Sequence, residues 1–127
     1  MVRRKFLKGS AAVAASGVIL AQSPAGKNNS QSPLIVFAEF YDKPGKENEQ
    51  RKGLLGLIGP TRKQKGCIQY DLHVDNESPA HFFFYERWAS KADLDAHAAS
   101  APLTAFGATS AALLTQPRRL MTGSLIG

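Results

Sequence analysis

The sequence contains very little cysteine and histidine, and these shortages exclude two kinds of small protein. Cys67 is the single cysteine among 127 residues, so no disulfide can form within the chain. Because Cys67 falls in an expected strand, we predict a buried and unreactive thiol there. The three histidines, His73, His81 and His97, lack the close spacing of zinc ligands. The sequence therefore indicates neither a disulfide-stapled scaffold nor a structural zinc module.

The chain also lacks an apolar run that is long enough to cross a membrane. The run Gly9–Ala21 has 13 residues, whereas a spanning helix needs roughly 20. Basic residues precede this run and small residues follow it, which is typical of a secretory signal. The adjacent arginines Arg3 and Arg4 resemble a twin-arginine export signal. We predict a signal peptide over residues 1–25 and no stable membrane anchor after its removal; a retained amphipathic helix is the alternative.

The excess of positive charge is small once this leader is set aside. The chain has 16 basic and 10 acidic residues, a net charge of +6, and residues 1–25 hold four of the basic residues and no acidic one. The remainder carries a net charge of +2, so we expect no nucleic-acid partner. Residues 26–33 are polar and predict a linker, and residues 34–127 predict one domain. The leader predicts a periplasmic or secreted protein.

The apolar patterning of the domain predicts six elements in the order strand, helix, strand, strand, helix, strand. The expected strands lie over 34–41, 67–74, 81–88 and within 117–127, and the expected helices lie over 46–65 and from Ser90 onward, with a restart near Ser100. Pro60 should kink or interrupt the first helix, and Gly66 should end it. This order is that of the ferredoxin-like split β-α-β fold, an α+β class with an antiparallel sheet and helices on one face.

The expected hairpin over 67–88, with a loop over 75–80, carries large apolar side chains on both faces. Tyr70 and Leu72 lie on one face, and Phe83 and Tyr85 on the other. Since the helices cover only one face of the sheet, the other face needs a partner surface. A second copy of the same sheet is the simplest partner, so we predict a homodimer.

Several short motifs together resemble one known family. They are Pro60-Thr61-Arg62, Gly66-Cys67, Tyr70 with Leu72-His73, Tyr85-Glu86 with Trp88, and Leu94-Asp95 with His97. This pattern resembles the antibiotic biosynthesis monooxygenase (ABM) family, and within it the quinol monooxygenase branch. One departure concerns the second histidine of that branch, because Leu103 stands near its place. The resemblance implies a dimeric α/β barrel and a monooxygenase that uses no metal, haem or flavin.

The resemblance also implies the substrates and the chemistry. A quinol-like or polyhydroxylated aromatic molecule would itself supply electrons to molecular oxygen. The protein would then contribute a base that removes a proton and a dry pocket that protects the intermediate.

The candidate base is His97, with Glu86 as the residue that orients its ring. The favoured hairpin register places Phe82, Phe84, Glu86 and Trp88 on one face, opposite Ile68, Tyr70 and Leu72; a register slipped by one residue would place Phe83, Tyr85 and Arg87 there instead. A helix from Ser90 then brings His97 over this face. A purely structural hydrogen bond between Glu86 and His97 would satisfy the same pattern. Candidate substrate-binding residues are Tyr70, Trp88, Phe84, His73 and Phe106.

Two other functions are compatible with these residues. A non-catalytic dimeric module could keep the fold and bind a small molecule without turnover. An isomerase or lyase could use the same acid-base pair without oxygen. Consumption of oxygen separates the monooxygenase from both.

Overall fold

The computed structural model describes residues 32–127, whose four strands form one antiparallel sheet. The strands are β1 (Leu34–Tyr41), β2 (Cys67–Asp75), β3 (Ser78–Trp88) and β4 (Arg119–Ser124), and they lie side by side in the order β2-β3-β1-β4. The predicted signal peptide, and all of the predicted linker except its last two residues, lie outside the described residues.

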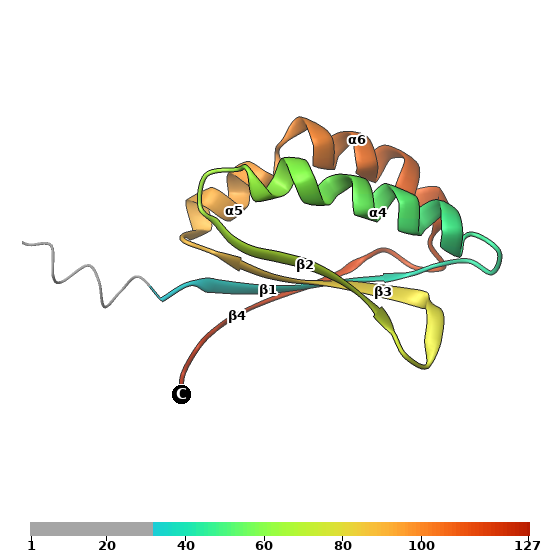
Figure 1. The fold of residues 1–127 in the computed structure, drawn as a ribbon, viewed down its shortest axis with the longest axis horizontal. Coiled ribbons are helices and arrows are strands. Elements are labelled where there is room, and N and C mark those ends of the chain that lie inside the picture. The colour runs from blue at the N-terminus through green and yellow to red at the C-terminus, as the bar shows by residue number, and fades with distance from the viewer. Residues whose placement is uncertain (1–31) are drawn as a thin grey trace, which may run out of the picture. The chain divides into compact units, whose positions relative to one another are not determined.

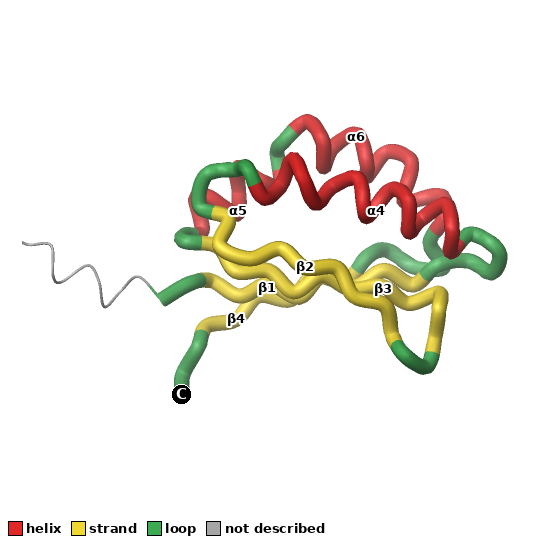
Figure 2. The backbone as a smooth tube through the Cα atoms, viewed as in Figure 1, coloured by secondary structure: helices red, strands yellow, loops and turns green. Residues whose placement is uncertain are grey.

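All the helices of the described residues lie on one face of this sheet (Figures 1 and 2). They are α4 (Glu47–Arg62), α5 (Lys91–Ala98), α6 (Ala101–Ser110) and the short 3-10 helix η4 (Ala111–Leu113). The strand order and the single helical layer confirm the ferredoxin-like α+β fold. Over residues 32–127, no helix has the length and apolar character needed to cross a membrane.

The covered face of the sheet, the face beneath the helices, holds the core. Alternate residues of the central strands point toward the helices and are buried, including Val36 of β1 and Phe84 of β3. The register confirms the favoured hairpin, since Tyr70 lies opposite Glu86 and Leu72 opposite Phe84. The open face carries the other set of side chains, among them Phe37, His73, His81, Phe83, Tyr85 and Met121.

The start of β2 departs from the predicted alternation. Cys67 pairs with Trp88 and Gln69 with Arg87, so Ile68 is an extra residue in a bulge. Ile68 is 47% exposed, and its predicted place beside Tyr70 was wrong because the bulge reverses the alternation. Cys67 packs against the core instead, and burial raises the pKa of its thiol. The turn of the hairpin is also tighter than predicted, because the strands extend to Asp75 and Ser78.

A kink or an interruption was predicted at Pro60, and the interruption does not occur, because helix α4 continues through Pro60 to Arg62. A proline removes the hydrogen bond to the carbonyl four residues earlier, here that of Gly56. Pro60 and Gly56 are both exposed, so water can satisfy that carbonyl. The helix is therefore disturbed only on its solvent side, while Leu54 and Leu57 stay buried on the other side.

A glycine fixes the connection between α4 and β2. Gly66 has φ +82°, a left-handed conformation, and a Cβ at this position would overlap the carboxyl group of Asp93. Asp93 belongs to the first turn of α5, where its backbone N–H donates to Ser90 Oγ at 3.1 Å. Ser90 is thus the N-cap of α5, at the predicted start of this helix, and Gly66 lets β2 start directly against it.

Candidate active site

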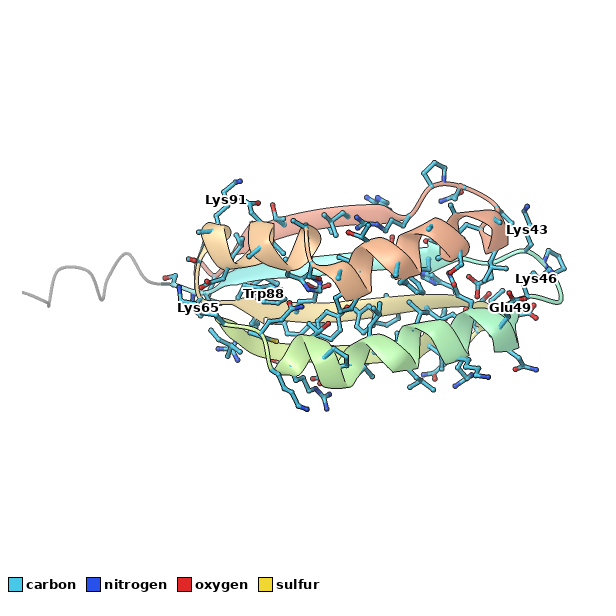
Figure 3. All side chains as sticks on the ribbon, turned by 90° about the horizontal axis from the view of Figure 1, so that it is seen from above. Lys43, Lys46, Glu49, Lys65, Trp88 and Lys91 are labelled. Carbon is cyan, nitrogen blue, oxygen red and sulfur yellow. The ribbon has the colours of Figure 1, made fainter. Side chains whose placement is uncertain are left out.

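A cavity of about 530 Å³ lies between the sheet and the helices, and its walls are mostly apolar. This volume is in the usual range for a small-molecule site. Figure 3 shows α4 along one side and α5 and α6 along the other, with Trp88 between them. The walls include Ala38, Phe40, Leu57, Tyr70, Phe84, Glu86, Leu94, His97, Leu103, Phe106, Ser110, Leu114, Arg118 and Leu120.

Glu86 lies in the cavity wall on β3 and is almost fully buried, with 3% of its surface exposed. The indole N–H of Trp88 donates to Glu86 Oε1 at 2.8 Å. Among the described residues, Oε2 accepts no hydrogen bond. Burial raises the pKa of the Glu86 carboxyl, because the charged form is poorly solvated there.

His97 lies in the same wall on α5 and is 5% exposed. Its Nδ1 lies 2.9 Å from Gln64 Oε1, and its ring stacks on Trp88 with centroids 4.7 Å apart. Burial, assisted by the positive charge of Arg118, lowers the pKa of His97 to about 4. The ring is therefore neutral at pH 7, and if Nδ1–H donates to Gln64 then Nε2 keeps its lone pair.

Glu86 and His97 thus share the cavity, but their hydrogen bonds go to other residues. Gln64 fixes the ring of His97, which is the task predicted for Glu86. Trp88 connects the pair, since its N–H bonds to Glu86 and its ring face stacks on His97. Gln64 could not be selected from the sequence, because it stands among basic residues just after the end of α4.

Three of the predicted substrate-binding residues line the cavity, namely Tyr70, Phe84 and Phe106. Tyr70 stacks on Phe84 with centroids 4.3 Å apart and meets His97 edge-on at 5.4 Å. Burial and the negative charge of Glu86 raise the pKa of Tyr70 well above its usual value, so its phenol stays neutral. These rings form an aromatic part of the cavity wall beside His97.

The other two predicted substrate-binding residues lie outside the cavity wall. Trp88 is fully buried behind His97, where it supports the wall. His73 lies on the open face, exposed to solvent, with its ring stacked on Phe83 at 5.0 Å. The strand alternation explains this position, because Leu72 and His73 point to opposite sides of β2.

Two further wall residues change the character of the cavity. Leu103 of α6 lines it at the place where the branch described above has a second histidine, so that part of the wall is apolar. Arg118, just before β4, adds a positive charge that lowers the pKa of both Glu86 and His97. Sequence reasoning did not select Arg118, because only the turn before β4 brings it to the cavity.

No group of three or more metal-ligating side chains with the geometry to hold an ion occurs in the part of the chain from Ser32 onward. The polar groups of the cavity are instead a carboxyl, a neutral imidazole, a phenol and a guanidinium. This set can accept a proton at His97 and donate hydrogen bonds to a small aromatic molecule.

Comparison with known proteins agrees with this architecture. The family profile described as antibiotic biosynthesis monooxygenase matches residues 33–109, and the chain belongs to that family. The chain is 34% identical over 86 residues to Rv0793 of Mycobacterium tuberculosis, whose name assigns it provisionally to the monooxygenases; the match covers 68% of this chain and 84% of that protein.

Solved structures of relatives show the same fold. The structure of Rv0793 superposes with a TM-score of 0.72 at 30% identity, covering 76% of this chain and 97% of that one. The structure of PA3566 from Pseudomonas aeruginosa gives a TM-score of 0.72 at 28% identity, covering 76% and 96%.

Proposed function

We propose that the protein is a cofactor-independent monooxygenase that oxidises a quinol-like or polyhydroxylated aromatic molecule with molecular oxygen. The observation that carries this proposal is a neutral, buried His97 in the wall of an apolar cavity, in a chain of the ABM family. A base of this kind can take a phenolic proton without first losing one of its own.

The cavity residues have distinct roles in this proposal. The substrate ring lies against the aromatic part of the wall formed by Tyr70 and Phe84, and one phenol group faces His97 Nε2. Gln64 holds the His97 ring in place through Nδ1. The apolar walls exclude water and so protect an anionic intermediate from wasteful protonation.

The reaction balances without a cofactor. His97 takes the phenolic proton, and the resulting phenolate transfers one electron to oxygen. The two radicals join in a bond between an adjacent ring carbon and oxygen. That carbon then loses its hydrogen as a proton while the O–O bond breaks, which leaves a carbonyl on the ring and releases the outer oxygen as water. Overall, one quinol and one oxygen molecule give one hydroxylated quinone and one water, and the substrate supplies all four electrons. The proton held by His97 leaves with the water.

Assembly and location are part of the proposal. The open face carries aromatic and sulfur-containing side chains, such as Phe83, Tyr85 and the 51%-exposed Met121, and a second copy of the sheet would cover them as a homodimer. The leader predicted over residues 1–25 would direct the protein to the periplasm or the outside of the cell.

The test is oxygen uptake by the purified chain with 1,4-dihydroxynaphthalene, in the presence of a metal chelator. We expect uptake well above the uncatalysed rate, and a loss of roughly 100- to 10,000-fold in His97→Ala. Because the pKa of His97 is about 4, the rate should fall on the acid side only near pH 4. His73→Ala is the matched control, since His73 lies on the open face, and it should keep full activity.

Other results of this test would contradict the proposed function or the role of His97. Uptake that persists in a folded His97→Ala variant would reject His97 as the base. Saturable binding without uptake would identify a binding module, and turnover without oxygen an isomerase or lyase. Circular dichroism of each variant checks the fold.

A further inference from the structure

Arg118 lines the cavity in the segment that joins η4 to β4. It is the only lysine or arginine among the described residues that form the cavity wall. Within residues 32–127 it forms no ion pair with a carboxylate; Glu86, the acidic residue of the wall, accepts the Trp88 indole N–H instead. Arg118 is exposed to solvent as well as part of the cavity wall, so its permanent positive charge lies on the solvent-facing side of the cavity, with no carboxylate partner among residues 32–127.

The neighbouring residue Arg119, in contrast to Arg118, pairs with a carboxylate. Arg119 donates from Nη1 to Glu39 Oε1 at 3.2 Å. The two partners pair across β1 and β4 on the open face, away from the cavity. Arg118 and Arg119 are thus consecutive, but Arg118 lines the cavity and Arg119 lies on the open face. Of the two, only Arg119 pairs with a carboxylate among residues 32–127.

The charge of Arg118 acts inside the cavity. Burial raises the pKa of Glu86 and of Tyr70 and lowers that of His97, and the positive charge of Arg118 is a smaller influence that acts downward on all three. An anionic group of a bound molecule would meet the same charge beside apolar walls, partly screened by solvent because Arg118 is exposed. A guanidinium has a planar fork of donors that matches the two oxygens of a carboxylate.

We propose that Arg118 is a specificity-determining residue that binds a carboxylate on the aromatic substrate. The cavity then selects hydroxylated aromatic acids over neutral aromatic molecules of the same shape. The aromatic ring lies on the apolar wall near His97, and the carboxylate lies toward the segment before β4. This inference rests on the proposed function, because it narrows the substrate class of the same site.

The experiment compares two probes that differ in charge but hardly in shape, 1,4-dihydroxy-2-naphthoate and its neutral carboxamide. Binding is measured without oxygen by quenching of Trp88 fluorescence, since Trp88 is the only tryptophan and contacts two wall residues. We expect the full chain to bind the carboxylate about 10- to 100-fold more tightly than the carboxamide. Arg118→Met should remove this preference, because it should weaken binding of the carboxylate much more than binding of the carboxamide.

Arg119→Met is the matched control, because it removes the adjacent positive charge on the open face, and it should retain the preference. The proposal is overturned by an unmodified protein without preference, by equal weakening of both probes in Arg118→Met, or by the same loss in Arg119→Met. If the carboxamide binds and is oxidised equally well, only this inference fails. If neither probe binds, the proposed aromatic site fails with it.

Discussion

The covered and open faces of the sheet each place a histidine near carboxyl groups, but the surroundings differ. On the covered face, His97 and Glu86 are both at most 5% exposed and bond to the neutral groups of Gln64 and Trp88. On the open face, His81 lies 2.9 Å from Asp75 Oδ2 and 3.5 Å from Glu39 Oε2.

This difference separates two uses of the same residue types. Burial among neutral partners keeps His97 uncharged, so a ring nitrogen is free to accept a proton, and burial raises the pKa of Glu86. On the open face, charged side chains of both signs lie together, and Arg119 pairs with Glu39 there. That face can therefore contact water or a polar partner surface. The helices create the difference, because they cover one face only (Figure 1).

The largest difference in stability is expected between alanine substitutions at two neighbouring phenylalanines, whose side chains point to opposite faces of the sheet. Phe84→Ala removes a ring that is 1% exposed, and it should lower the free energy of unfolding by about 3–5 kcal/mol. Phe83→Ala on the open face should cost about 1 kcal/mol in the monomer, because Phe83 is only half-buried. Urea unfolding of both variants at low protein concentration measures this, and equal losses would remove the distinction between the faces.

The next effect is a dependence of stability on pH. The pKa of His97 is lowered from 6.5 to about 4 in the folded chain, so the unfolded chain binds a proton between these values and the folded chain does not. Stability should therefore fall as the pH falls from 6.5 to 4, by about 3 kcal/mol from this residue. In His97→Gln this contribution should vanish, while in His81→Gln it should remain. Parallel curves for the unmodified chain and His97→Gln would contradict the assignment.

The smallest effect on stability is expected from changing one glutamate on each face to glutamine. The two changes in stability should have opposite signs. The pKa of Glu86 is raised, so its carboxyl favours folding at low pH and this advantage is lost as the pH rises. Glu86→Gln should then raise stability at pH 8. Glu39→Gln removes the negative charge that attracts Arg119 and should lower stability by up to about 1 kcal/mol. Thermal unfolding at pH 8 distinguishes the two, and the same sign for both would refute the comparison.

Much of the fold could be predicted from the sequence because it depends on local patterns. The strand over 34–41 and the cap at Ser90 follow from alternation and from a hydroxyl before a helix. The bulge at Ile68 could not be predicted, since one extra residue in a strand leaves no mark on composition. The exposed position of Pro60 could not be predicted either, because it depends on which side of α4 faces water.

The candidate site was predictable only in part, for a related reason. His97 and Glu86 could be placed on the covered face from periodicity and register, and both line the cavity. The partner of His97 could not, because Gln64 follows α4 and meets α5 only through tertiary structure. The bond from Trp88 to Glu86 joins residues two apart on the same face of β3, so it is compatible with the strand pattern. Arg118 reaches the cavity only through tertiary structure, which no local pattern encodes.

The place of β4 in the sheet has a consequence for folding. This strand pairs with β1, the strand farthest from it in the sequence, and every one of its residues is exposed. Closing so long a chain segment is entropically costly, so pairing of β4 belongs to the late steps of folding. Leu120 and the segment before it form part of the cavity wall, and the hairpin can therefore be complete before the cavity exists. The lifetime of an intact cavity is then limited by the fraying of one weakly anchored edge strand.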